Sequence, residues 1–476
     1  MGYIPDLSRV NGFAYKPGEL LLSPNSPMIS AKRLLADRYT TDEIQLLYRH
    51  RGAFYCWQSS HYHEITDQYL KADINLFLDC AQRISENKEG KQTKIPFHPK
   101  RVHVGEIMGA LESLAYLGDI LQPPFWLGDR VPDLDPTELL ACANGLLHLP
   151  THELLKHTPT FFTHNAIDYS YDPRAPQPLQ WFGFLRELWP TDDASILALQ
   201  EWFGYCLVAD TSYQKAFMLV GPKRSGKGTI ARVLEAVIGP HNAVSPTLAS
   251  LAGEFGLAPL IGKRLAIISD ARISTKTDTA VVAERLLSIT GEDSVSANRK
   301  FLAHWRGKLE VRFLVLSNEL PRIADASGAL PSRFIVLMLT NSFFGKEDRG
   351  LTARLLGERS GILNWAIAGY ERLSARGYFQ QPESAADAIR DLEDLGSPIS
   401  AFLRDKCIIA PGRAVACSDL FDEWKLWSDS QNQGNAGTLQ TFGRDIRSAV
   451  PGLRTINARS EDGRSRVYDG IGIQRY

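Results

Sequence analysis

Four short apolar runs in the middle of the chain dominate its pattern of hydrophobic and polar positions. They are separated by polar or helically spaced stretches, and they occupy residues 216–220, 264–269, 312–317 and 334–339. Runs of this length that alternate with helices are typical of parallel strands buried on both faces. The pattern predicts an α/β core with a parallel sheet over residues 213–395.

The residues ahead of this core show a different pattern. A Pro-, Gly- and Ser-rich stretch predicts an extended arm over 1–30, and helical spacing then predicts a mainly helical domain over 31–137. Its expected parts are helices at 31–50, 67–84 and 104–121, strand-like residues at 52–65, and a solvated loop at 85–100, for which a DNA contact is the less favoured reading.

Residues 138–212 are dense in proline and aromatic side chains, so they are too apolar for a flexible tether. We expect a compact helical collar here that joins the first domain to the core. Two helices are expected between 178 and 207, with Asp192 or Asp193 as the cap of the second.

The last segment, 396–476, has the pattern of a separate small domain. Three amphipathic stretches are followed by a hairpin that turns at Glu461 to Gly463, which predicts a winged helix. Residues 438–476 hold seven arginines against four acids. This local excess favours a duplex or origin DNA contact over a plain surface, with Arg459, Arg464 and Arg466 as the contacting residues.

A glycine-rich run follows the first apolar strand and opens a helical pattern. Glycines at such a turn let successive backbone N–H groups face an anion, and a lysine can reach the outer phosphates. A tight turn that only needs glycine is the less favoured alternative. The expected nucleotide-binding residues are Gly221, Pro222, Lys223, Arg224, Ser225, Gly226, Lys227, Gly228 and Thr229.

The position after Lys227 departs from the usual motif. It is Gly228, and the hydroxyl that would hold magnesium comes one residue later, at Thr229. The same ending occurs in nucleoside monophosphate kinases. The loop therefore predicts nucleotide phosphate binding without deciding the reaction.

Three more polar residues flank the later strands. Asp270 ends the second strand, where a carboxylate can hold magnesium, and Asn318 ends the third, where an amide can orient a phosphate or a water. Arg333 precedes the fourth strand and is a candidate for reaching a neighbouring subunit's triphosphate. A turn asparagine is an equally good interpretation of Asn318 alone.

Residues 291–312 predict a projecting hairpin. Cations and one aromatic side chain near its tip would suit a sugar-phosphate backbone with a stacked base. The expected DNA-binding residues are Arg299, Lys300 and His304, with Trp305 and Arg306 beside them.

Composition limits the remaining choices. A length of 476 residues predicts several domains, and a net charge of -1 requires any polyanion site to be a local patch. No run is long enough to cross a membrane, and six cysteines without a CxxC pair fit a reducing compartment. We expect a cytoplasmic protein in a bacterial host cell.

The order GPKRSGKGT, GKRLAIISDA, TGEDSVSANRKF, LVLSNELPRI, ALPSRFIVL and ERSGILNWAIAGYERL resembles superfamily 3 helicases of the phage and plasmid primase-helicase branch, which is related to the poxvirus primase-helicase. The resemblance covers about residues 135–476. It implies an AAA+-like core, a homohexameric ring, ATP hydrolysis with Mg2+ and translocation on single-stranded DNA during replication.

By position, the resemblance implies that Lys227 binds the triphosphate, Thr229 and Asp270 the metal, Asn318 acts as the sensor and Arg333 as a finger in trans. The resemblance also implies that Lys300 corresponds to the lysine on the hairpin of these helicases. The general base stays open between Glu284 and Glu319. No primase constellation is evident in residues 1–130, so a separate primase or polymerase is an expected partner. A nucleoside kinase and an ATP-regulated DNA loader remain the alternative functions.

Overall fold

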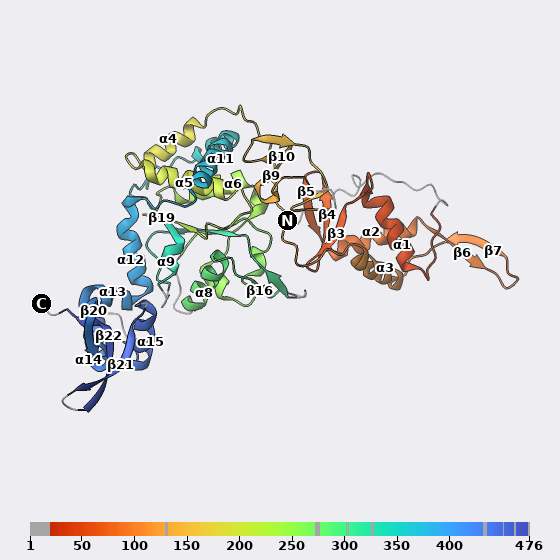
Figure 1. The fold of residues 1–476 in the computed structure, drawn as a ribbon. Coiled ribbons are helices and arrows are strands. Elements are labelled where there is room, and N and C mark those ends of the chain that lie inside the picture. The colour runs from red at the N-terminus through yellow and green to blue at the C-terminus, as the bar shows by residue number, and fades with distance from the viewer. Residues whose placement is uncertain are drawn as a thin grey trace. The chain divides into compact units, whose positions relative to one another are not determined.

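The computed structural model describes residues 20–128, 132–271, 277–300, 302, 304–323, 325, 328–431, 436–450, 452–460 and 463–474. The chain divides into two compact units. Met1–Asp172 with Phe301–Trp305 forms the first unit, and Pro173–Lys300 with Arg306–Tyr476 forms the second. Figure 1 gives the labels used below.

The first unit is mixed rather than mainly helical. Helices α1 (Pro27–Arg38), α2 (Asp67–Asp79) and α3 (Arg101–Leu114) share one apolar core that includes Leu34, Ile74 and Leu111. Strands β3 (Leu47–His50), β4 (Ala53–Gln58) and β5 (His61–Ile65) form an antiparallel sheet. Most of the extended arm expected at 1–30 lies outside the described residues, and α1 begins within it.

The structure overturns three local predictions in this unit. Thr41–His50 is not helical, because Asp42 and Glu43 take positive φ angles of 50° and 66° and reverse the chain into strands that pair with their neighbours. The loop expected at 85–100 is largely a hairpin of β6 (Gln82–Glu86) and β7 (Gln92–Pro96). The third helix ends at Leu114 and not at residue 121.

The first part of the collar, expected to be helical, consists of short strands. Pairing between neighbouring apolar segments decides the structure here, not helix propensity. The strands are β9 (Leu139–Cys142), β10 (Gly145–His148), β11 (Glu153–Leu155) and β12 (Phe161–Phe162), and β12 pairs with β8 (Phe125–Trp126), which lies ahead of the collar. Helical structure begins only at α4 (Leu179–Leu188).

A five-stranded parallel sheet forms the centre of the second unit. Its spatial order is β14 (Ala243–Val244), β15 (Leu265–Ile268), β18 (Arg312–Ser317), β13 (Ala216–Val220) and β19 (Phe334–Met338). The four predicted strands are confirmed, and they are almost wholly buried because both faces are covered. The fifth strand, β14, has only two residues and left no pattern in the sequence.

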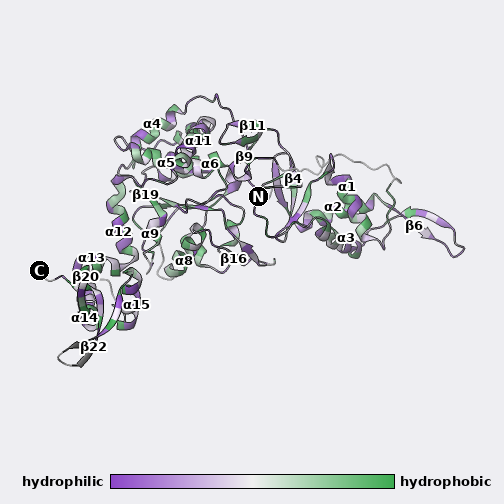
Figure 2. Cartoon of the chain, viewed as in Figure 1, coloured by the Kyte–Doolittle hydropathy of each residue, from purple (hydrophilic) through white to green (hydrophobic). Residues whose placement is uncertain are grey.

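Helices surround this sheet, and many of them carry both hydrophobic and hydrophilic residues (Figure 2). Asp192 caps α5 by accepting a hydrogen bond from the Ser195 backbone N–H, 3.0 Å, as predicted. The helices are α5 (Asp193–Tyr205), α6 (Lys227–Ile238), α7 (Leu248–Ala252), α8 (Thr279–Thr290), α9 (Leu330–Arg333), α10 (Leu351–Gly357), α11 (Arg359–Arg376) and α12 (Ala386–Gly396). None of the helices in the described ranges combines the length and apolar character that a membrane span needs.

The C-terminal segment has a core of its own. Helices α13 (Pro398–Lys406), α14 (Cys417–Ser430) and α15 (Leu439–Ala449) pack around Phe402, Leu420 and Ile446. The predicted hairpin is β21 (Arg454–Ser460) with β22 (Gly463–Ile473), and β20 (Cys407–Ala416) adds an unpredicted strand in the order β20-β22-β21. The three predicted helices and the hairpin are therefore present.

Candidate functional site

The glycine-rich run forms the turn between β13 and α6. Gly221 lies so close to the neighbouring strand that a Cβ would come within 2.3 Å of the Leu339 carbonyl oxygen. Gly226 has a φ of +90°, which side-chain-bearing residues rarely adopt, and a Cβ there would lie 3.0 Å from Leu188. Glycine is thus required at both ends of the loop, which lets the backbone pass tightly before the first turn of α6.

Lys227 is the first residue of α6, and its ammonium folds back over the loop. Its Nζ donates to the carbonyl oxygens of Gly221 at 2.6 Å and Pro222 at 2.8 Å, and lies 3.1 Å from Ser225 Oγ. It also lies 3.3 Å from Asn318 Oδ1, across 91 positions of sequence. Burial lowers the pKa of Lys227. The structure therefore brings Lys227 and Asn318 together at one end of the sheet.

Thr229 lies half-buried in the first turn of α6, and its hydroxyl accepts from Arg232 Nη2 at 3.3 Å. A cavity of about 260 Å3 lies beside this turn, between α6 and strands β15 and β18. It is lined by Lys227, Gly228, Ala231, Arg232, Glu235, Ser245, Ile267, Ser269 and Leu316. Arg232 and Glu235 were missed from the sequence, although positions four and seven after Gly228 lie on the same face of a helix as Gly228.

Asp270 and Asn318 follow the carboxyl ends of β15 and β18, and both are exposed. Because parallel neighbours end at the same edge, the two residues share the edge that carries the glycine-rich loop. A second cavity, of about 800 Å3, is lined by Ser317, Glu319, Arg322 and residues of α12. Of the two candidate bases, Glu319 borders this cavity, whereas Glu284 is exposed on α8.

The segment after β19 braces the loop, a feature that sequence reasoning did not find. Phe343 donates its backbone N–H to the Arg224 carbonyl at 2.9 Å, and Ser342 Oγ donates to the Lys223 carbonyl at 2.8 Å. Glu347 lies 3.4 Å from Arg224 Nε. The segment that follows β19 thus holds the loop in place.

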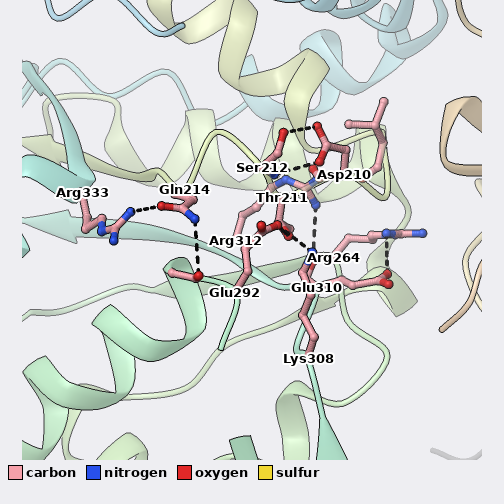
Figure 3. A network of polar contacts seen from close by, with 12 residues as sticks. Asp210, Thr211, Ser212, Gln214, Arg264, Glu292, Lys308, Glu310, Arg312 and Arg333 are labelled. Atoms are coloured by element: carbon pink, nitrogen blue, oxygen red, sulfur yellow. Dashed lines mark hydrogen bonds and ion pairs between the residues drawn. The ribbon is translucent and has the colours of Figure 1, made fainter. Parts of the chain in front are cut away.

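Arg333 lies at the opposite edge of the sheet, just before β19 begins. Its Nη1 donates to Gln214 Oε1, and Gln214 stands two residues ahead of β13 (Figure 3). The five residues of β13 separate this edge from the glycine-rich loop, a span of about 16 Å. Arg333 therefore does not meet Lys227 of the same chain.

Buried charges fill the rest of this amino edge. Arg312, 1% exposed, donates to the carbonyl oxygens of Val208 and Asp210, and its guanidinium lies 4.2 Å from the centre of the Tyr205 ring. Arg264 pairs with Glu310 at 2.9 Å, and burial lowers its pKa to about 10. The amino edge is thus a network of polar contacts within the chain (Figure 3), although the buried Nε atoms of Arg264 and Arg312 have no hydrogen-bond partner in it.

Glu292 belongs to the same network. Its Oε1 accepts from Thr211 Oγ1 and from Lys308 Nζ, both at 2.6 Å. Burial raises the pKa of Glu292, but hydrogen bonds from Lys308 and Thr211 outweigh burial and hold the pKa below its ordinary value of 4.5. Glu292 is therefore a carboxylate at neutral pH.

The expected hairpin exists as a ribbon of β16 (Val295–Ala297) and β17 (Trp305–Gly307). Lys300 and His304 are exposed between the strands, and Arg299 is half-buried. Trp305 begins β17 directly after these residues, but it is buried, so its ring is not exposed for the base stacking that the sequence suggested. In the C-terminal hairpin, Arg459 pairs with Arg464 in backbone register and the Arg466 side chain is exposed.

Comparisons with known proteins bear on the same segments. Residues 219–333 match a protein family of unknown function (DUF5906), and residues 107–190 match the family described as D5 N terminal like. An apo structure of the NrS-1 C-terminal region is 15% identical, covers 93% of this chain and 99% of its own, and has a TM-score of 0.49. A second is 16% identical, with 94% and 99% coverage and a TM-score of 0.48.

Proposed function

We propose that this chain is an ATP-dependent DNA helicase of replication, built on an AAA+-like phosphate-loop core with a C-terminal winged helix. The observation that carries the proposal is the division of polar residues between the two edges of the parallel sheet. Lys227 and Asn318 meet at the carboxyl edge, and Arg333 stands at the amino edge. The match of residues 107–190 to the D5 N terminal like family supports the same class.

The carboxyl edge fits a nucleoside triphosphate. The loop has glycine where a Cβ would clash, and a helix of 12 residues begins at Lys227, so backbone N–H groups at its start can face phosphate oxygens. The ammonium now contacts carbonyl and amide oxygens, the type of atom that phosphates would supply. Thr229 and Asp270 would hold Mg2+, and Asn318 would orient the outer phosphate or the attacking water.

The amino edge fits a role in trans. Arg333 is separated from its own loop by the length of β13, so it can act only on the triphosphate of another copy. A closed ring of identical subunits, with a homohexamer as our proposal, places each such arginine beside the next subunit's loop. The arginine would then stabilise charge that develops on the transferred phosphoryl group.

The basic residues supply the polyanion contacts. Lys300, His304 and Arg299 on the ribbon would contact single-stranded DNA in the ring. Arg459, Arg464 and Arg466 would contact duplex or origin DNA. A separate primase or polymerase remains a proposed partner, and a bacterial cytoplasm the proposed location.

Turnover measurements separate this proposal from its alternatives. A helicase should hydrolyse ATP faster when single-stranded DNA is added, and it should separate a forked duplex. Phosphate transfer to a nucleoside acceptor would favour a kinase. Hydrolysis with DNA binding but no strand separation would favour a loader. Turnover per molecule that stays constant at every protein concentration would contradict the ring.

A further inference from the structure

We propose that Gln214 is a positioning residue that couples the orientation of Arg333 to the root of the β16–β17 ribbon. The inference rests on the proposed function and adds to it a specific contact between the trans-acting arginine and the DNA-contacting element of the same subunit. Gln214 contacts both Arg333 and Gly291, which lies in the turn ahead of the ribbon, at the amino edge of the sheet (Figure 3).

The side-chain amide of Gln214 has two partners. Its oxygen accepts from Arg333 Nη1, and its nitrogen donates to the Gly291 carbonyl oxygen at 3.4 Å. Gly291 is four residues ahead of the first strand of the ribbon. A Cβ at Gly291 would lie 2.8 Å from the Leu287 carbonyl oxygen and 3.7 Å from Arg333 Nη2, so this turn passes close to the guanidinium. One amide group therefore connects the guanidinium to the turn from which the ribbon begins.

The backbone that carries Gln214 is itself fixed. Gln214 has a φ of 53°, and its N–H donates to the Thr211 carbonyl at 2.9 Å, closing a tight turn. Arg312 fixes the same segment by donating hydrogen bonds to the carbonyl oxygens of Val208 and Asp210. A shift of the ribbon root would therefore act on the side-chain contacts and not be absorbed by the segment.

Glu292 provides a second connection between the ribbon and the turn that carries Gln214. Glu292, next to Gly291, accepts from Thr211 in the Gln214 turn and from Lys308, which directly follows Gly307 at the end of the ribbon. Both ends of the ribbon and the turn that positions Arg333 thus share one small network. Because an energetic link between distant sites needs an element that both sites bias, this network is the candidate element.

Gln214→Glu tests the coupling with little change in shape. The carboxylate keeps an acceptor for Arg333 but has no hydrogen to donate to the Gly291 carbonyl. We expect the stimulation of ATP turnover by an oligothymidine strand, expressed as the ratio of stimulated to basal rate, to fall by about fivefold or more. Gln177→Glu, an exposed residue with the same charge change, is the matched control and should keep the wild-type ratio.

A second measurement does not depend on turnover. In the wild type, a non-hydrolysable ATP analogue should change the affinity for oligothymidine. In Gln214→Glu and Gln214→Ala this change in affinity should be lost. The thermal unfolding midpoint of Gln214→Glu should stay close to that of the wild type. A wild-type stimulation ratio and a wild-type affinity shift in both variants would overturn the coupling alone. A wild type that DNA does not stimulate would overturn the proposed function, and this inference with it.

Discussion

The two edges of the parallel sheet use polar residues in opposite ways. At the carboxyl edge, Asp270 and Asn318 are exposed and two cavities open beside them. At the amino edge, Arg264 and Arg312 are buried and hydrogen-bonded within the chain. In the function we propose, the exposed edge receives the nucleotide, whereas the buried edge holds Arg333 in one orientation. On this proposal, a subunit carries two half-sites that cannot meet within itself.

Arg333→Ala should have the largest effect on turnover. An arginine that acts on a neighbour's triphosphate contributes about 10^3-fold or more to the rate, so ATP turnover should fall by that amount. Arg349→Ala, an exposed arginine with no part in the proposal, is the control. Normal hydrolysis by Arg333→Ala in a steady-state phosphate-release assay would remove it from the mechanism.

Lys227→Ala should nearly abolish turnover without unfolding the protein. Loss of a cation that stabilises phosphate charge costs about 10^2 to 10^3 in rate. The side chain is only partly buried, so the thermal midpoint should stay close to that of the exposed-lysine control Lys32→Ala. A large drop in the midpoint would instead make Lys227 a structural residue.

Arg312→Met should act mainly on stability and not on turnover, because Arg312 lies at the buried edge. The substitution leaves the Val208 and Asp210 carbonyl oxygens without their donor and removes the contact with Tyr205. We expect a loss of about 3 kcal/mol in the free energy of unfolding, measured by denaturant titration. Asn318→Ala, at the exposed edge, should cost about 0.5 kcal/mol or less. Equal costs at both edges would contradict the comparison.

Lys300→Ala should weaken single-stranded DNA binding while sparing basal hydrolysis and blocking strand separation. Because each phosphate contact releases about one counterion, the slope of log affinity against log salt should fall by about 0.7. The affinity is measured by fluorescence anisotropy of a labelled strand at several salt concentrations. Unchanged unwinding of a forked duplex by Lys300→Ala would exclude the ribbon from the mechanism.

Glu292→Gln should have the smallest effect, a small loss of stability at neutral pH that disappears in acid. The pKa of Glu292 is lowered in the folded chain, so its carboxylate contributes stability above pH 4.5, and this contribution is lost as the pH falls through the lowered pKa. The variant lacks this contribution, so its thermal midpoint should decline less steeply in that window. A steeper decline in the variant would reverse the assigned sign.

Short patterns in the sequence predicted the parts of the structure that neighbouring residues determine. The buried strands were clear because continuous apolar runs have few other uses, and the loop was clear because Gly221 and Gly226 follow such a run. The helix predicted over Thr41–His50 was wrong, because pairing of β3 with β4 outweighs the helical spacing of the sequence.

Contacts between distant segments left no local signal. Gln214 and Arg333 are 119 positions apart, and nothing near either residue announces the other. Glu292 carried no assignment of its own in the predicted hairpin, although it joins three segments of the amino edge. The buried Arg312 looked like an ordinary strand residue with a charge. The positions of Asp270 and Asn318 at strand ends were readable, since parallel strands share one carboxyl edge.

Mixing two inactive variants tests most directly whether catalytic sites are shared between copies. Lys227→Ala retains Arg333, and Arg333→Ala retains Lys227, so an equal mixture that exchanges subunits should contain intact pairs at about a quarter of its interfaces. The account predicts that ATP turnover returns to about that fraction of the wild-type rate. Turnover that stays at the level of the separate variants, in a mixture shown by mass to have exchanged subunits, would contradict it.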